Sequence, residues 1–526
     1  MNDDGILIFC PGCLIAKTMA KGFENFSNKF IGAIERGGNA LPHPAALFGI
    51  FGLITILVSG LGHLLGWHGV NPANGETVSV INLVSKDGLH RIILGMVDSY
   101  TGFAPLGIVM VALLGIGVAE SSGLIKTAIN AVIQRAPAKS ITFIIVFSGI
   151  LSNVASDLGY ILIIPLSGVV FHTLGRHPVA GMSAAFAGVS GGFSANLLIG
   201  TIDPLLAGLS TEAARIIDPE YYVMPTANYY FMVVSTLVIS LAGTWVTHAW
   251  VEPRLGKYTG DVPIEQVTRL SAREKKGLVW VLIVFLAWIA IFAAGLIPDN
   301  GFLRGPDNTV LHSPLLKGFI AVLFIVASSL GMVYGFISGT FRNHTDVING
   351  MSSSFKGLVS FLVLVFFASQ FVAWFKWSNL GLILAIKGAA VLQAMDIGLI
   401  PLVILFVLFS GFINLFMGSA SAKWAIMGPV FIPMFMLLGY SPELSQAVFR
   451  VGDSVTNVIS PMMSFFALII VYYQKYDSKS GLGTLIGTML PYSIVFFIVW
   501  TLLLIAWIVT GLPLGPEAGL YYTGQH

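Results

Sequence analysis

The sequence predicts an all-α polytopic membrane protein, in which nine transmembrane helices and two re-entrant helical hairpins form inverted-topology repeats. Its 526 residues are 56% hydrophobic and only 10% charged, whereas soluble domains carry roughly 25% charged residues. Some apolar runs are long enough to cross about 30 Å of hydrocarbon, and others, of about a dozen residues, are too short. One pattern of polar residues within apolar runs occurs twice, once in each half of the chain.

The fuller copy of this pattern runs from 409 to 461 and carries eight polar or aromatic side chains in an apolar background. They are Ser419, Ser421, Lys423, Trp424, Arg450, Asp453, Thr456 and Asn457. The earlier copy is divided between residues 147–165 and 187–204. Lipid tolerates irregular polar backbone only where it lines a cavity or is buried in protein. Matching interruptions in two halves of a membrane protein therefore point to a transport site.

The composition excludes several classes of function. A formal net charge of +2 argues against a nucleic-acid partner. The two cysteines, Cys10 and Cys13, form a C-P-G-C motif that is weak evidence for a metal or redox site. The absence of a G-x-x-x-x-G-K motif argues against ATP-driven transport. We expect no cofactor, apart from Na⁺ as a coupling or structural ion.

The first half of the chain is expected to hold two spans, an amphipathic arm, a short-helix pair and a broken helix. The spans are 47–65 and 102–119, with a polar loop at 66–89, the arm is 121–139, the pair is 141–151 with 158–170, and the broken helix is 179–209. The pair reads as a re-entrant hairpin with its tip at Ser152 to Asp157. Gly191, Gly192, Ser194 and Asn196 interrupt the broken helix and free backbone groups for a ligand.

The second half repeats this order. Spans are expected at 231–250, 278–296, 320–339, 358–375 and 485–510, an arm at 376–396, a hairpin at 397–413 with 425–438, and a broken helix at 442–471. The second hairpin has its tip at Asn414 to Lys423, and the second helix breaks at 453–461. The repeats thus cover about 90–209 and 350–473, within one transmembrane domain of residues 41–526.

The distribution of Lys and Arg predicts the orientation. The amino-terminal segment of residues 1–40, the first arm and the linker at 251–276 carry four, three and six of these residues, more than the loops on the opposite side, which places them in the cytoplasm. Lys376 and Lys387 on the second arm are the exception. With nine crossings, the amino terminus is cytoplasmic and the carboxyl terminus periplasmic, in a bacterial inner membrane.

Several dispersed phrases resemble the AbgT family, the p-aminobenzoyl-glutamate transporters, in its MtrF/YdaH-like branch. They are TGFAPLG (101–107), GRHPVAG (175–181), GGFSANLLIGTIDPLLAG (191–208), STEAA (210–214), VEPRLG (251–256), GSASAKWA (418–425), FRVGDSVTN (449–457) and GLPLGP (511–516). The resemblance implies a homodimer in the lipid bilayer with an elevator-like relation to the ion transporter superfamily. It also implies export of folate-pathway metabolites such as p-aminobenzoyl-glutamate, and of sulfonamide drugs, by an antiporter.

The resemblance also implies a set of functional positions on the substrate and proton pathway. They are Asp203, Asn414, Ser421, Trp424, Pro442, Arg450, Asp453 and Pro461. Lys423 departs from the family pattern, in which this position is uncharged, so the electrostatics of the second tip are an open question.

The residues themselves indicate anion and cation binding near mid-membrane. Return helices of re-entrant hairpins present free N–H groups and about half a positive charge to an anion. Oxygen atoms at the tips and breaks suit a hard cation such as Na⁺. The candidate cation ligands are Asn153, Asp157, Asn196, Ser419 and Asn457. The alternative for the tip Ser and Gly residues is helix capping and close packing.

Arg450 and Asp453 are three residues apart, so we expect them to share a helix face and form an ion pair. Either the pair is structural, or it takes part in transport, as is typical of ionisable residues within the membrane. In the second case, protonation of Asp453 releases Arg450 to hold a substrate anion. Asp203 is either a second proton or cation carrier or a helix cap beside Pro204.

Trp424 has two interpretations, a flat face for an aminobenzoyl ring or an ordinary packing residue. For the whole protein, the leading hypothesis is a proton-driven exporter, and the alternative is a Na⁺-coupled importer of p-aminobenzoyl-glutamate. An intramembrane enzyme needs a nucleophile and base or a metal set, which neither tip supplies. A passive channel is the third option.

Overall fold

The computed structural model describes residues 42–522 and 524, apart from 71–76, 135–136, 156–158, 264–269, 306–307, 309–312 and 356–358. Within this part the chain is almost entirely helical, and its only strands form one short antiparallel hairpin. The tip residue Asp157, the cysteines Cys10 and Cys13, and the segment 1–40 lie outside the described residues.

The helices of the first half follow the predicted order. They are α2 (Pro44–Leu64), α3 (Lys86–Thr101), α4 (Ala104–Ser121), α5 (Leu124–Gln134), α6 (Ile141–Leu151), η1 (Ser152–Ala155), η2 (Gly159–Ile163), α7 (Ile164–Thr173), α8 (Pro178–Phe186), η3 (Ala187–Gly191) and α9 (Ile202–Ala214). The strands β1 (His68–Val70) and β2 (Thr77–Ser79) pair between α2 and α3. One prediction is wrong in detail, because the second span begins at Lys86 within the expected polar loop, where Ser85 caps α3.

The second half contains the remaining helices. They are α10 (Tyr229–Val246), η4 (Thr247–Val251), α11 (Glu252–Leu255), α12 (Ala272–Leu296), α13 (Pro314–Lys317), α14 (Phe319–Ser338), α15 (His344–Ser354), α16 (Val359–Trp377), α17 (Leu380–Ala394), α18 (Leu399–Asn414), α19 (Ala420–Leu437), α20 (Pro442–Asn457), α21 (Phe466–Gln474) and α22 (Leu482–Thr510). The predicted arm is α17, bent by 70° from α16.

Among the described residues, seven helical segments are long and apolar enough to cross a membrane, or eight when the bent pair of α16 and α17 is included. The broken helices, α8 with α9 and α20 with α21, do not meet that length individually. The seven include α19, which is longer than the short hairpin helix expected at 425–438, so that expectation is wrong in length. The nine predicted crossings instead include both broken helices, so that number stays a prediction.

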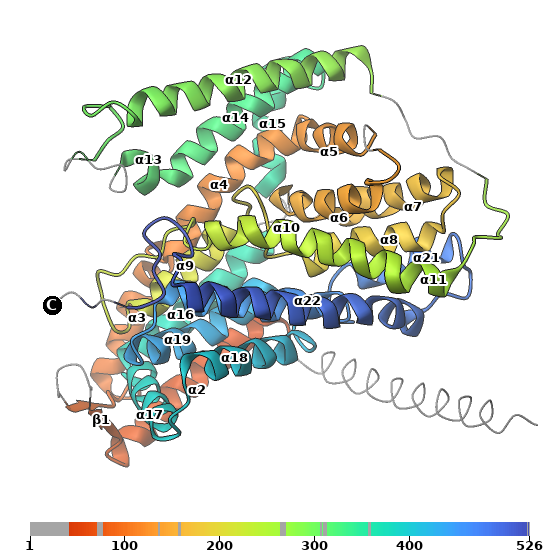
Figure 1. Cartoon of the computed structure of the whole chain (residues 1–526). Helices are drawn as coiled ribbons and strands as arrows, with labels where there is room; N and C mark the ends of the chain where they lie inside the picture. The colour runs from red at the N-terminus through yellow and green to blue at the C-terminus, as the bar shows by residue number, and fades with distance from the viewer. Residues whose placement is uncertain are drawn as a thin grey trace, which may run out of the picture.

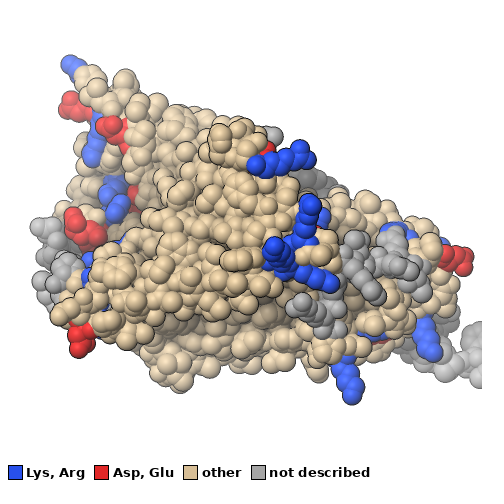
Figure 2. Space-filling view, turned by 90° about the horizontal axis from the view of Figure 1, so that it is seen from above, with Lys and Arg blue, Asp and Glu red and all other residues tan. Residues whose placement is uncertain are grey.

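The two hairpins lie towards different ends of the molecule. Figure 1 shows α7 and α8 towards the right, with α21, and shows α9, α17 and α19 towards the left. Figure 2 shows a broad band of uncharged residues between one group of charged residues at the left and a second, mainly Lys and Arg, farther to the right. This arrangement fits an apolar belt between two polar faces.

Small residues allow the helices to approach closely. A Cβ atom at Gly331 of α14 would lie 2.6 Å from the backbone nitrogen of Ala119 in α4, and one at Gly115 would lie 2.6 Å from Cα of Phe324. Gly149 of α6 similarly faces the backbone of α8, since a Cβ atom there would lie 2.9 Å from the Ala185 carbonyl. Close packing of this kind is typical of helices in membranes, and it fixes the first hairpin against the first broken helix.

Candidate functional site

Helix α20 forms the centre of the site. Ser441 caps it by accepting a hydrogen bond from the backbone of Leu444, and Pro442 occupies its first turn. The helix packs against α18, α19, α9, η3 and α22, and nearly all of its side chains are buried. Gln446, Arg450 and Asp453 follow one another at helical spacing, so they project from one side. A buried polar stripe on a membrane helix requires partners from its neighbours.

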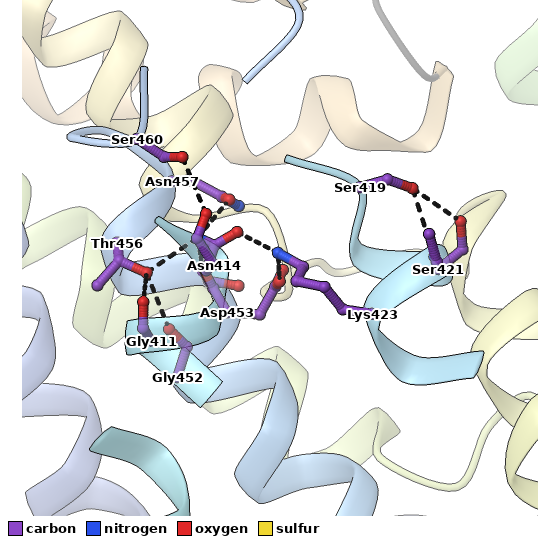
Figure 3. Close-up of polar contacts among 12 residues, drawn as sticks. Gly411, Asn414, Ser419, Ser421, Lys423, Gly452, Asp453, Thr456, Asn457 and Ser460 are labelled. Carbon is purple, nitrogen blue, oxygen red and sulfur yellow. Dashed lines mark hydrogen bonds and ion pairs between the residues drawn. The ribbon is translucent and has the colours of Figure 1, made fainter. Parts of the chain in front are cut away.

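Asp453 takes its partner from the second hairpin. Its Oδ1 atom forms an ion pair with Nζ of Lys423, and both side chains are 1% exposed or less. The Lys423 ammonium also donates a hydrogen bond to Oδ1 of Asn414 at the end of α18. Figure 3 shows Lys423 reaching from α19 to lie between these two residues. The second hairpin therefore supplies the counter-charge for the second broken helix.

The orientation of the Asn414 amide is set by its surroundings. Its Nδ2 atom lies 2.7 Å from the Asp453 carbonyl oxygen, 2.9 Å from Thr456 Oγ1 and 2.9 Å from Asn457 Oδ1, and can donate to these acceptors. Its backbone carbonyl accepts a hydrogen bond from Ser460 at 2.9 Å. Because the nitrogen faces several acceptors, the side-chain oxygen must face Lys423.

Arg450 takes its partner from the first broken helix. Its Nη2 atom lies 2.7 Å from Oδ1 of Asp203, and these side chains are 4% and 2% exposed. The same nitrogen donates to the Ser194 carbonyl at 3.4 Å. Asp203 lies in the first turn of α9, where its Oδ2 atom accepts a 2.7 Å hydrogen bond from the backbone of Gly200 and the helix dipole favours a negative charge.

The expected ion pair between Arg450 and Asp453 is therefore wrong. Both residues lie on α20 as predicted, but Arg450 pairs with α9 and Asp453 with α19. Spacing of three residues places two side chains on one face, yet it does not prevent longer side chains from reaching other helices. The result is two ion pairs that join α20 to both halves of the chain.

The two broken helices contact each other at their breaks. The backbone of Ser194 donates to Ser454 Oγ at 3.2 Å, and Asn457 Nδ2 donates to the Ser190 carbonyl at 3.4 Å. Beyond the first tip, the ring of Tyr160 stacks on Phe465 with centroids 4.5 Å apart. The first hairpin thus reaches the second break, and the second tip reaches the same break through Asn414.

Trp424 lies in the core beside this junction. It is fully buried, its ring stacks on Phe449 with centroids 4.5 Å apart, and its Nε1 atom donates to Ser210 Oγ at 2.9 Å. One face of the ring is therefore already covered by protein. An aromatic solute would have to use the other face or displace Phe449.

A buried polar chain beside Trp424 was not predicted from the sequence. Ser210 donates to Gln446 Oε1 at 2.6 Å, Gln446 donates to Asn228 Oδ1 at 2.8 Å, and Asn228 donates to the Glu443 carbonyl at 2.9 Å. The available signal was that Gln446 lies one helical turn before Arg450. These residues connect Trp424 to the amino-terminal end of α20.

Tyr221, in the loop after α9, ends this chain. Its hydroxyl donates to Glu443 Oε2 at 2.9 Å. Burial, with the nearby Glu443 carboxylate, raises the pKa of Tyr221 above its usual range. The phenol therefore keeps its proton and serves as a hydrogen-bond donor.

Other predicted site residues lie at the edge of this cluster. Ser419 caps α19, and its hydroxyl lies 3.3 Å from that of Ser421. Figure 3 shows this serine pair set apart from the Asn414 cluster. Pro442 begins α20 about three turns before Asp453, while Pro461 follows the end of α20 at Asn457. The ion pairs thus do not include these four residues.

The candidate cation ligands are already largely hydrogen-bonded. Asn196 Oδ1 accepts from the backbone of Leu197 and Leu198, and Asn457 Oδ1 accepts from Asn414. Asn153 Oδ1 is buried and accepts no hydrogen bond from the described residues. Its Nδ2 atom and that of Asn196 both donate to the Ile150 carbonyl. Asn153 and Asn196 therefore lie together at the Ile150 carbonyl.

Comparisons with known proteins agree over nearly the whole chain. Residues 29–522 match the model of the AbgT putative transporter family. The p-aminobenzoyl-glutamate transport protein of Escherichia coli K12 is 37% identical over 496 residues, which cover 94% of this chain and 97% of that protein.

Two solved structures are also similar. The MtrF structure from Neisseria gonorrhoeae, described as illuminating a class of antimetabolite efflux pumps, has a TM-score of 0.89 and 47% identity over 93% of this chain and 100% of that chain. The YdaH transporter of Alcanivorax borkumensis has a TM-score of 0.86 and 45% identity over 90% of this chain and 100% of that chain.

Proposed function

Since the chain belongs to the AbgT putative transporter family, we propose that it is an ion-driven secondary transporter that exports anionic aromatic solutes. The solute class is that of p-aminobenzoyl-glutamate, which the Escherichia coli relative is named for transporting. Sulfonamides are included because the MtrF relative is described as an antimetabolite efflux pump. These relatives are named as transporters rather than enzymes.

The observation that carries the proposal is the pair of buried ion pairs on α20. In the described structure the counter-charge of the Arg450 guanidinium is Asp203. Two events would release the guanidinium from Asp203: binding of a solute carboxylate, which it can hold by two parallel hydrogen bonds, or binding of a proton to Asp203. Export requires these two states to alternate, so that the protein moves outward with solute and returns with the proton.

Asp453 is the second candidate proton carrier. Its Oδ2 atom accepts no hydrogen bond from the described residues, while Oδ1 contacts Lys423. Trp424 donates to Ser210, and Ser210 donates to Gln446, which lies one helical turn before Arg450 on α20. We propose that an aromatic ring and its amide are bound beside these residues. We also propose that the protein is a homodimer with inverted repeats, that it moves solute by an elevator-like movement, and that its amino terminus is cytoplasmic.

The proposal is tested with purified protein in liposomes. A proton gradient of either direction is imposed, and movement of radiolabelled p-aminobenzoyl-glutamate is followed with and without a protonophore. We expect solute to move against an inward proton flow and to stop when the gradient is collapsed. Flux that continues unchanged without any gradient would instead indicate a passive channel.

A Na⁺-coupled importer is the second candidate, and one observation favours it. Asn153 Oδ1 is a buried oxygen without a hydrogen-bond donor among the described residues, beside the first break. A hard cation binds such oxygen atoms. The same liposomes with an imposed Na⁺ gradient separate the candidates, because only the importer accumulates solute with inward Na⁺.

A further inference from the structure

We infer that Lys423 acts as a covalently attached counter-cation, which occupies the place that a monovalent coupling cation would take between α18, α19 and α20. This inference rests on the proposed transport function and concerns which ion that function uses.

The ammonium lies among oxygen ligands. It contacts a carboxylate oxygen of Asp453 and the amide oxygen of Asn414. Lys423 is 1% exposed, so water has little access to replace these contacts. An ammonium is a compact point charge with several donors, and oxygen ligands of this type are those that hard monovalent and divalent cations also prefer.

The surrounding hydrogen bonds hold the oxygen atoms in place. The Asn414 amide cannot turn its oxygen away, because its nitrogen faces the Asp453 carbonyl, Thr456 and Asn457. Thr456 Oγ1 in turn lies 3.2 Å from the Gly411 carbonyl, which α18 contributes. The Asn414 oxygen beside Lys423 is therefore preorganised independently of the lysine.

Removal of the lysine charge would leave this cluster with an uncompensated carboxylate. A buried charge must be paired or must bind a cation. Asp453 has a second carboxylate oxygen, Oδ2, that accepts no hydrogen bond from the described residues. Together with Asn414 Oδ1, the two carboxylate oxygens would offer Na⁺ three ligands at the position that Lys423 vacates.

The consequence for transport is that this site cannot take Na⁺ in the wild-type chain. The charge of Asp453 is balanced from within the protein, so solute movement needs no Na⁺ here. The Lys423→Met variant removes the charge while keeping an unbranched side chain, and it should convert the cluster into a Na⁺ site.

The test measures ²²Na⁺ binding to the purified full-length chain, with K⁺ and choline salts as competitors. We expect Lys423→Met to bind Na⁺ at least tenfold more tightly than wild type. The double variant Lys423→Met with Asp453→Asn should lose that binding. Lys387→Met, at an exposed lysine of α17, is the matched control and should behave as wild type.

Two results would overturn the inference. One is Na⁺ binding by wild type that Asp453→Asn abolishes, because the site would then accept Na⁺ with Lys423 present. The other is a monodisperse Lys423→Met protein that binds no Na⁺. If Lys423→Met protein is recovered only in Na⁺-containing buffer, that result supports the inference. If the variant cannot be purified at all, the comparison of Na⁺ binding between wild type and Asp453→Asn still tests the inference.

Failure of this inference is distinguishable from failure of the proposed function. Sodium binding is measured without any solute, so it is independent of what the chain transports. If the wild-type protein transports p-aminobenzoyl-glutamate but folded Lys423→Met protein binds no Na⁺, only this inference is contradicted. If the wild-type protein transports no such solute, only the proposed function is contradicted.

Discussion

Lys423 of the second hairpin and Asp453 of the second broken helix form an ion pair in which neither side chain is more than 1% exposed. The pair joins α19 to α20, which also contacts α9 through Arg450 and Asp203. Removal of one partner from such a pair typically costs about 3–5 kcal/mol, whereas replacing both partners with uncharged residues can be neutral. Stability and transport can therefore be separated at this pair.

We predict that Asp453→Asn lowers both the thermal stability and gradient-driven transport. The stability loss is expected to be about 3 kcal/mol, because the Lys423 charge remains buried without its counter-charge. Lys423→Met combined with Asp453→Asn should recover most of that stability, since neither charge remains. Transport by the double variant should still be at least tenfold below wild type, because one of the two proposed proton carriers is absent.

Thermal melts in detergent and proton-driven flux in liposomes measure the two effects. Lys387→Met combined with Asp453→Asn is the control and should stay as unstable as Asp453→Asn alone. Full transport by the stable double variant would remove Asp453 from the coupling mechanism and leave Asp203 as the carrier.

We predict that Arg450→Lys weakens solute binding by about tenfold or more. A lysine keeps the charge but loses the planar, two-donor geometry with which arginine binds a carboxylate. It also loses the simultaneous contact of Nη2 with Asp203 and the Ser194 carbonyl. Equilibrium binding of labelled p-aminobenzoyl-glutamate is the measurement. Arg273→Lys, at an exposed position on α12, should bind like wild type, and equal affinities for the two variants would count against solute binding by Arg450.

The architecture was largely predictable because lipid imposes strong constraints on sequence. The short apolar runs 141–151 and 397–413 predicted α6 and α18, and the polar interruption after Gly191 predicted the first break. The second break was predicted to begin too early, at Asp453, because α20 continues through Asn457. The start of α3 at Lys86 was not predicted. Its first turns carry charged residues, Lys86, Asp87 and Arg91, that are typical of a loop, although Ser85 provides a helix cap.

The pairing within the site was less predictable for a physical reason. Sequence spacing places Arg450 and Asp453 on one face of α20, but their partners come from α9 and α19, which lie far away in the sequence. Long-range pairing depends on how the helices pack. Lys423 was identified as unusual, yet only the position of α19 against α20 shows that it neutralises Asp453.

We predict that Trp424→Phe is tolerated far better than Trp424→Ala. Phenylalanine keeps the stacking on Phe449 and loses only the hydrogen bond to Ser210, at a cost of about 1 kcal/mol. Alanine leaves a cavity in the core and should cost about 3–5 kcal/mol. Thermal melts give both values. If Trp424 also stacks on the solute, Trp424→Phe should retain the preference for aromatic over aliphatic anions, and loss of that preference would show that the indole itself is needed.

We predict that the stability of the protein decreases below about pH 6.5 through His177, in the turn between the first hairpin and the first broken helix. Its Nδ1 atom caps α8 by accepting a hydrogen bond from the backbone of Val179 at 3.2 Å. Burial lowers the pKa of His177 below its usual value of 6.5, and nearby Asp477 only partly opposes this effect. Protonation would also remove the capping acceptor.

The sign follows from the two states. Below pH 6.5 the histidine of the unfolded chain gains a proton while that of the folded chain stays neutral, so unfolding becomes more favourable until the pH falls below the lowered pKa. His177→Asn keeps a capping side chain that does not titrate in this range, and should flatten the decrease in melting temperature between about pH 7 and pH 5. His90→Asn, at an exposed histidine of α3, is the control. An unchanged pH profile in His177→Asn would show that other groups cause the loss of stability in acid.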